Sequence, residues 1–234
     1  MRAIALPGIG IVAFFLLAAA PAQAPTPLVR GYDVLISAGH EGRPQSCPRF
    51  PTHHCNLGAA GERAWTPIVA DAATSVLRSH GITVARLPAD FAPSYAVRAA
   101  VFIHFDGAIP ACSSAASVGY PSAGDRMAAQ SWKRLYGRYF HFGFHPDNFS
   151  VGLRRYYAYR QTRASAGAFV LELGEITCPA QRAWLAPRLR WEGALIAYWL
   201  GRLLDKGHVP MPQKLSFAKR PANEIPAQVP SMVR

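Results

Sequence analysis

The feature that most constrains this fold is a series of short apolar segments, each ending near a polar side chain. The first runs from Asp33 to Ala38 and stops at Gly39-His40. Its shortness, its β-branched content and the small-residue break after it favour a strand over a helix. A histidine there would lie beyond the carboxyl end of a buried strand, where ligands bind in open α/β sheets. Taken alone, His40 is more typical of a structural histidine, so a functional interpretation depends on which other residues lie near it.

Three more apolar segments predict strands at 82–87, 101–106 and 168–174. Helices are predicted from Thr66, an N-cap followed by Pro67, and over 125–139 and 181–204. The remaining segments predict long loops, one helical turn around 95–100 and an edge strand over 151–160. The strand–helix–strand order predicts parallel pairing. We therefore expect a single α/β domain with a mixed, mostly parallel sheet flanked by helices on both faces.

The N-terminus predicts export. Residues 1–24 combine a basic start at Arg2, an apolar run over 9–20 and an A-x-A site at 22–24, which is typical of a cleaved signal peptide. An uncleaved anchor is the alternative. The expected location is periplasmic or extracellular. Residues 25–206 then form one catalytic domain, and the proline-rich segment 207–234 is expected to be a flexible tail.

If the protein is exported, its four cysteines are expected to form disulfides. An even number of cysteines in an oxidising compartment indicates disulfides. Three pairings are possible. We expect Cys47–Cys55, which closes a short loop, and Cys112–Cys178, which joins two segments that each follow a strand. A thiolate zinc site would require C-x-x-C spacing, which the chain lacks.

The formal net charge of +12 predicts attraction to anionic surfaces such as cell wall or membrane. A surface that merely keeps the protein soluble is the alternative. The basic residues are scattered and no nucleic-acid motif accompanies them, so nucleic acid is not an expected partner. We expect a monomer.

Four polar side chains recur at comparable places: His40 and His104 near strand ends, Glu62 at a helix start, and Glu172 in a strand. Two imidazoles and one carboxylate form a catalytic zinc set that leaves a position open for water. A second carboxylate would be the general base. The spacings of 22, 42 and 68 residues are too long for a local motif, so an accidental collection of polar residues is the alternative.

The order of these residues resembles the zinc-dependent N-acetylmuramoyl-L-alanine amidases of the amidase-3 type. Ser37-Ala-Gly-His-Glu-Gly42 stands where that family has D-P-G-H-G-G, and Gly58-Ala-Ala-Gly-Glu62 matches its glutamate after a glycine turn. Phe102-Ile-His-Phe-Asp106 matches its S-I-H-A-N, and Leu171-Glu-Leu-Gly-Glu175 its V-E-x-G-F. The match covers residues 33–205 in order, and it is good only at the short motifs.

The resemblance implies one zinc ion per chain, bound by His40, Glu62 and His104, with Glu172 as the catalytic carboxylate. The implied reaction is hydrolysis of the amide between N-acetylmuramic acid and L-alanine, in peptidoglycan or muropeptides. Two alternatives remain: another zinc-dependent amide or peptide hydrolase on the same scaffold, and a non-catalytic wall-binding protein whose site has decayed.

Positions at which this sequence departs from the family pattern provide further candidates for the general base and for substrate binding. Glu175 replaces the family's aromatic residue and is the alternative base. Asp106 replaces an asparagine and is expected to bond a ligand histidine or to contact substrate. Arg154 is expected to hold a substrate carboxylate, although a structural arginine is the alternative. The tyrosines at 156, 157 and 159 fit either a groove wall or the packing of an edge strand.

Overall fold

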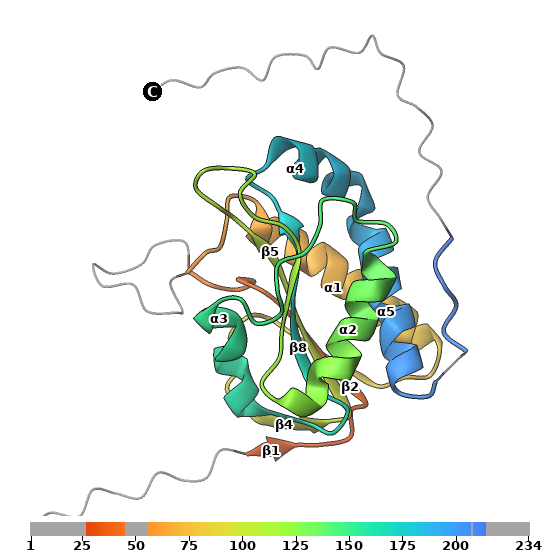
Figure 1. The fold of residues 1–234 in the computed structure, drawn as a ribbon. Helices are drawn as coiled ribbons and strands as arrows, with labels where there is room; N and C mark the ends of the chain where they lie inside the picture. The colour runs from red at the N-terminus through yellow and green to blue at the C-terminus, as the bar shows by residue number, and fades with distance from the viewer. Residues whose placement is uncertain (1–26, 45–55, 207, 214–234) are drawn as a thin grey trace, which may run out of the picture.

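The computed structural model describes residues 27–44, 56–206 and 208–213, and its centre is a five-stranded sheet (Figure 1). The strand order is β3-β2-β5-β8-β6. The first four strands are parallel: β3 (Val84–Leu87), β2 (Val34–Ala38), β5 (Ala99–Asp106) and β8 (Ala168–Glu175). The edge strand β6 (Ser117–Gly119) is antiparallel to β8. This is the predicted α/β architecture, and β6 lies within the segment 107–124 that we expected to be a loop.

Alternate residues of the central strands pack into two separate apolar clusters. Val34, Ile36, Val101, Ile103 and Leu171 belong to the larger cluster, while Leu35, Ala100, Phe102 and Val170 belong to the smaller one. This is the period-two alternation of a strand that is buried on both faces. His104 and Glu172 continue the alternation of the smaller cluster, so their side chains project from that face of the sheet.

Three helices cover the face of the larger cluster: α1 (Glu62–Ser79), α2 (Arg126–Tyr136) and α5 (Leu189–Leu203) (Figure 1). A 3-10 turn, η2 (Ala123–Asp125), precedes α2. Helices α1 and α5 lie very close together at Gly193, where a Cβ would collide with the Val69 carbonyl. Glycine is therefore required at this crossing. The close contact holds α1 in place, and the N-terminus of α1 carries Glu62.

The other face is covered by a second, parallel sheet and two short helices. The sheet order is β1-β4-β7, formed by Leu28–Val29, Ser94–Val97 and Thr162–Ala164. The helices are α3 (Val151–Arg154) and η3 (Tyr157–Gln161). The helical turn predicted around 95–100 is therefore wrong, because β4 pairs with strands on both sides. The edge strand predicted over 151–160 is also wrong: the Ser150 side chain caps α3 by accepting from the Leu153 amide.

Two helix boundaries differ from the sequence prediction. The segment 181–204 is not one helix but α4 (Pro179–Leu185), η4 (Ala186–Arg188) and α5. Pro187 lies at the break, where proline lacks the amide that a continuous helix would need. Helix α1 begins at Glu62 rather than after Thr66, so Pro67 lies inside the helix at the cost of one backbone bond.

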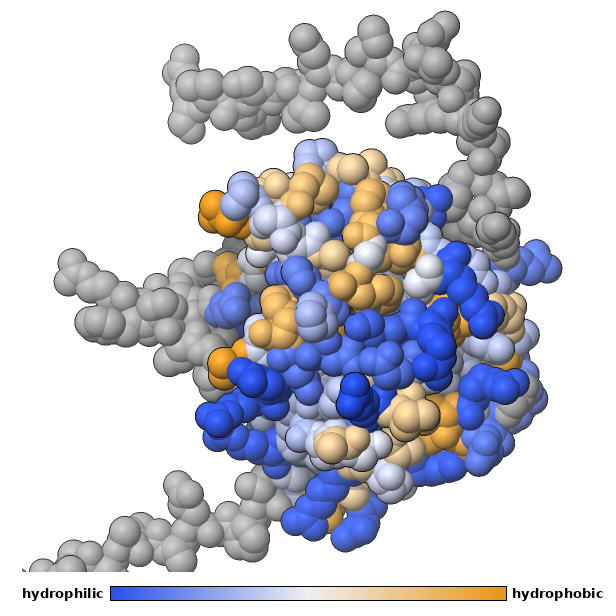
Figure 2. Space-filling model, viewed as in Figure 1, coloured by the Kyte–Doolittle hydropathy of each residue, from blue (hydrophilic) through white to orange (hydrophobic). Residues whose placement is uncertain are grey.

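Cys112 and Cys178 form a disulfide, whereas the expected Cys47–Cys55 pair lies outside the described residues. The expected signal peptide and most of the expected tail also lie outside them. The described part of that tail, 208–213, lies against the domain: Val209 is buried, and Trp191 Nε1 donates to the Gln213 carbonyl over 3.0 Å. None of the helices described here has the length and apolar character that a membrane crossing requires. Hydrophilic residues occupy much of the face shown in Figure 2.

Candidate metal centre

Three side chains meet at the carboxyl end of the central sheet. One ligand atom from each of His40, Glu62 and His104 lies within 4.8 Å of the other two. Glu62 Oε1 is 3.3 Å from His40 Nε2 and 3.0 Å from His104 Nδ1. All three side chains are buried. The structure thus brings together residues that are 22 and 42 positions apart in the chain.

His40 is held in an unusual backbone conformation directly after β2. Its φ of 62° lies in the left-handed region, which residues other than glycine seldom adopt. Its Nδ1 lies 2.6 Å from the Asn56 carbonyl oxygen and 3.0 Å from Arg43 Nη1, so two partners hold the ring at this nitrogen. Arg43 donates to the same carbonyl over 2.7 Å. The other ring nitrogen, Nε2, faces Glu62 Oε1 at 3.3 Å.

Glu62 is anchored by backbone amides at the start of α1. Its Oε2 accepts from the Ala59 amide over 2.9 Å, and its Oε1 accepts from the Phe105 amide over 3.0 Å. Burial alone would raise the pKa of Glu62, but bonds and charge attraction from His104 and His40 outweigh it and lower that pKa to about 2. The side chain is therefore an ionised, immobile carboxylate.

His104 lies near the end of β5 and turns its ring toward the second face of the sheet. Its Nδ1 faces Glu62, and its Nε2 is 2.9 Å from the Tyr156 hydroxyl. Burial lowers the pKa of His104, although its bond with Glu62 and the charge of Glu62 oppose this. A Cβ at Gly39 would collide with this ring, which explains why the turn after β2 needs glycine there.

This donor set fits a zinc ion. Neutral imidazole nitrogens and one carboxylate oxygen are established zinc ligands, and three protein ligands are the number found at catalytic zinc sites. Glu62 Oε1 lies within 3.3 Å of one nitrogen of each ring, and a shared cation would bind at these same atoms in place of the ring protons. The ring nitrogens that face away have partners of their own, as is usual for metal-binding histidines.

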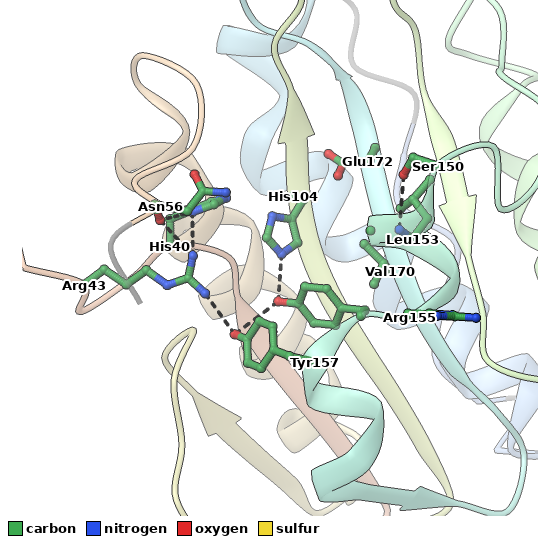
Figure 3. A pocket seen from close by; sticks show the side chains of 12 residues that line it. His40, Arg43, Asn56, His104, Ser150, Leu153, Arg155, Tyr157, Val170 and Glu172 are labelled. Carbon is green, nitrogen blue, oxygen red and sulfur yellow. Dashed lines mark hydrogen bonds between the residues drawn. The ribbon is translucent and has the colours of Figure 1, made fainter. Parts of the chain in front are cut away.

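Glu172 lies beside this cluster on the neighbouring strand. It is in register with His104 across β5 and β8, and both side chains border the same cleft (Figure 3). Its Oε2 is buried and has no hydrogen-bond partner among the described residues. Burial, together with the negative charges of Glu62 and Asp106, raises the pKa of Glu172 well above its ordinary value. A carboxyl group in that setting binds protons readily.

Two hollows adjoin the cluster and share His40, Asn56, His104 and Glu172. One has a volume of about 370 Å³ and is bordered by Arg43, Tyr156, Tyr157 and the residues of α3. The other has a volume of about 410 Å³ and is bordered by residues 105–109 and Thr177. The candidate ligands therefore lie at the junction of two accessible spaces rather than at the bottom of one.

Three other predicted residues have surroundings that differ from the expectation. Asp106 borders the second hollow, but its carboxylate accepts from Gly107 N and Ser114 Oγ and not from a ligand histidine. Arg154 borders a separate hollow with Arg126 and Lys133, away from the metal cluster. Glu175 is fully buried and binds loop amides rather than facing the cleft.

Sequence reasoning missed Arg43 and Asn56 and left the role of Tyr156 and Tyr157 open. Arg43 and Asn56 hold His40, and Tyr156 and Tyr157 lie beside His104. Their only signals were the polarity of Arg43 and Asn56 near the first motif and the adjacent tyrosines. The tyrosines were equally consistent with a groove wall, which is where they lie.

No family model matches the sequence, and no curated protein matches it either. Solved structures share the fold at low identity. Ami1, the N-acetylmuramyl-L-alanine amidase from Mycobacterium smegmatis, is 17% identical with a TM-score of 0.54, over 75% of this chain and 98% of that one. The catalytic domain of CwlV, an N-acetylmuramoyl-L-alanine amidase from Bacillus (Paenibacillus) polymyxa var. colistinus, is 14% identical with a TM-score of 0.52, over 77% and 99%. Cwp6 from Clostridium difficile is 17% identical with a TM-score of 0.51, over 76% of this chain but 29% of its own length. The chain has the fold of these amidase domains.

Proposed function

We propose that this chain, which has the fold of amidase catalytic domains, is an exported zinc-dependent amidase of the cell wall. Its substrate would be peptidoglycan or its muropeptide fragments, and the bond hydrolysed would be the amide between N-acetylmuramic acid and L-alanine. The observation that carries the proposal is the junction of His40, Glu62 and His104 with the unpartnered Oε2 of Glu172 in the same cleft. The match of the short motifs and the shared fold support the same assignment.

In this proposal His40, Glu62 and His104 hold one zinc ion through the atoms that face one another. The chemistry that zinc supplies when bound is Lewis acidity, which polarises an amide carbonyl and acidifies water at the site. The chain supplies the rest. Asn56 and Arg43 hold the His40 ring, and backbone amides hold Glu62, so these ligands are oriented before the ion binds.

Glu172 would be the proton carrier. Its carboxylate takes a proton from the attacking water and delivers it to the nitrogen of the departing L-alanine. A carbon–oxygen bond forms and the carbon–nitrogen bond breaks, which leaves a lactyl carboxylate and a free amine. The Oε2 of Glu172 has no hydrogen-bond partner among the described residues, so it is available to take that proton.

The two hollows suit a bond in the middle of a longer substrate. A muramic acid with its neighbouring sugar and a stem peptide extend in opposite directions from the scissile amide. Spaces of about 370 and 410 Å³ meet at the metal cluster, so each could accept one side of the substrate. The net charge of +12 would draw the protein to an anionic wall or membrane surface.

The decisive experiment combines metal analysis with product analysis. Protein purified without chelator is expected to contain one zinc ion per chain. It is also expected to release, from purified muropeptides, stem peptides that carry a free amino group on their N-terminal L-alanine. A protein that neither holds nor acquires zinc would contradict both this proposal and the rival zinc hydrolase. A zinc-loaded protein that leaves muropeptides intact but cleaves other amides would favour the rival hydrolase. Zinc-free protein that still binds wall sacculi would favour the decayed, non-catalytic alternative.

A further inference from the structure

We propose that Tyr156 is a positioning residue, which together with Tyr157 fixes His104 in the tautomer that can bind a metal through Nδ1. This inference rests on the metal site of the proposed function, but not on the identity of the substrate. Tyr156 is the N-cap of η3 and Tyr157 is its first residue, and neither belongs to the four short motifs. They therefore extend the site into the second face of the sheet.

Four groups form a continuous chain of hydrogen bonds. His104 Nε2 lies 2.9 Å from the Tyr156 hydroxyl, which donates to the Tyr157 hydroxyl over 3.3 Å. The Tyr157 hydroxyl donates in turn to the Ala89 carbonyl. Arg43 Nη2 also donates to the Tyr157 oxygen, over 3.3 Å (Figure 3).

The groups at the end of this series of hydrogen bonds determine which atom donates and which accepts in each bond. The Ala89 carbonyl can only accept, so the proton of Tyr157 is committed to it, and an arginine can only donate. The Tyr157 oxygen must therefore accept, and the proton of Tyr156 points toward it. The Tyr156 oxygen is then available to His104 only as an acceptor. When His104 Nδ1 and Glu62 share a cation, the proton of His104 therefore lies on Nε2, where the Tyr156 oxygen accepts it.

The groups that set this direction are themselves fixed. Ser37 donates to the Pro88 carbonyl over 2.8 Å, and the Ala89 amide donates to the Glu41 carbonyl over 3.2 Å, so the segment that carries the terminal acceptor is tied to the first motif. The Tyr156 ring packs against Phe102 and His104, with centroids 5.0 and 5.4 Å away. Residues that are not metal ligands thus restrict both the tautomer and the orientation of His104.

The test compares three tyrosine-to-phenylalanine variants. Tyr156→Phe removes the acceptor of the His104 proton, and outer-shell losses of this kind typically weaken metal binding 10- to 100-fold. Tyr157→Phe keeps the Tyr156 hydroxyl but frees its proton to point at His104, which favours the wrong tautomer, so a smaller loss is expected. Tyr159→Phe is the matched control: its ring also packs on Phe102, but its hydroxyl is bonded to the Leu153 carbonyl. Its zinc affinity is expected to equal that of the original protein.

Two readouts are needed besides hydrolysis. Chelator competition gives the zinc affinity of each variant. Two-bond ¹H–¹⁵N correlation spectra of the imidazole rings identify the tautomer, and His104 is expected to carry its proton on Nε2 in the zinc-loaded protein. If Tyr156→Phe fails to fold, Tyr157→Phe and Tyr159→Phe still provide the comparison.

The outcomes separate this inference from the proposed function. Unchanged zinc affinity in both Tyr156→Phe and Tyr157→Phe, or a His104 proton on Nδ1, would overturn the inference even if hydrolysis were normal. Weakened zinc binding in those two variants but not in Tyr159→Phe would support it, even if the original protein failed to cleave muropeptides. In that last case the proposed substrate would be wrong while the positioning role stood.

Discussion

At the residue scale, two glutamates three positions apart on β8 have opposite surroundings. Glu172 has a buried Oε2 without a hydrogen-bond partner among the described residues and borders both hollows. Glu175 accepts from the amides of Cys112 and Ser114, each over 2.7 Å, and from the Thr177 hydroxyl. An unpartnered carboxylate in a cleft is available for proton transfer, whereas a saturated one holds a loop in place.

This contrast predicts different defects for two matched substitutions. Glu172→Gln should reduce amidase turnover by about 100-fold or more, because it removes a proton-transfer group, and should leave zinc content unchanged. Glu175→Gln should instead cost roughly 1–3 kcal/mol of unfolding free energy, because an amide nitrogen would face a backbone donor. Turnover on muropeptides and chemical denaturation measure the two effects. Full activity in Glu172→Gln would contradict its assigned role.

Gly39→Ala tests how closely the first turn approaches the site. A Cβ at this position would collide with the His104 ring, so the ring must leave its present position beside Glu62. We expect zinc affinity to fall at least tenfold, since displaced ligands bind poorly. Gly124→Ala is the control, because its Cβ would meet only Ser122 Oγ at an ordinary 3.5 Å. Equal zinc affinities of the two variants by chelator competition would show that the ring has room to move.

The sequence predicts the ligand set but not the residues that orient it. The four predicted residues each lie at an element boundary or within an apolar strand: His40, Glu62, His104 and Glu172. Burying a polar side chain there costs free energy unless it has a partner, so its presence indicates a function. Asn56 acts through its backbone carbonyl, which no residue type reveals. The approach of Tyr156 to His104 depends on how the second face of the sheet is covered, and local pattern carries no information about that packing.

At the element scale, α2 and α5 share a buried polar contact beneath the large apolar cluster. The Tyr136 hydroxyl is 2.8 Å from the Leu173 carbonyl and 2.9 Å from Glu192 Oε1. One hydroxyl proton cannot serve two acceptors, so a protonated Glu192 would supply the second. Burial raises the pKa of Glu192 to about 8, only partly opposed by the bond from Tyr136. This helix pair therefore prefers a neutral carboxyl group.

The raised pKa of Glu192 predicts how stability depends on pH. Between its ordinary pKa of 4.5 and about 8, the folded protein keeps a proton that the unfolded chain releases. Its stabilising contribution is therefore complete below pH 4.5 and is lost as pH rises toward 8, with a slope of at most about 1.4 kcal/mol per pH unit. Glu192→Gln should remove that slope. Denaturation of both proteins at several pH values measures it, and parallel curves would contradict the prediction.

The sequence predicts element types best where apolar periodicity is long and uninterrupted. All four predicted central strands are present, because a strand buried on both faces is a continuous apolar run. The segment 181–204 reads as one amphipathic helix, yet Pro187 separates α4 from α5. The segment 151–160 is rich in tyrosine and reads as a strand, but the Ser150 cap starts a helix. In both cases one local backbone requirement outweighs composition.

At the scale of the whole molecule, the site lies at the carboxyl end of the central sheet, and the apolar clusters on the two faces of that sheet each position part of it. The larger cluster positions α1 and with it Glu62, whereas the smaller cluster positions the tyrosines beside His104. The strands between them carry His104 and Glu172 at neighbouring positions. A fold class can be predicted from strand and helix order alone. The second sheet could not be, because its strands are only two to four residues long and become stable through pairing with one another.

The Cys112–Cys178 disulfide predicts a stability effect that is separate from the metal site. It closes a loop with a sequence separation of 66 residues, for which the entropy of the unfolded chain gives about 4 kcal/mol of stabilisation. The double variant Cys112→Ser/Cys178→Ser should lose roughly that much unfolding free energy. The double variant is preferable to a reducing agent, which would also act on any other disulfide.

The same variant should keep its zinc affinity. In the folded state Glu175 still binds the amides of Cys112 and Ser114, so the loop beside the second hollow keeps its place. Denaturation at a fixed zinc concentration measures the first quantity and chelator competition the second. Weakened zinc binding in the folded double variant would show that the disulfide, rather than Glu175, positions this loop.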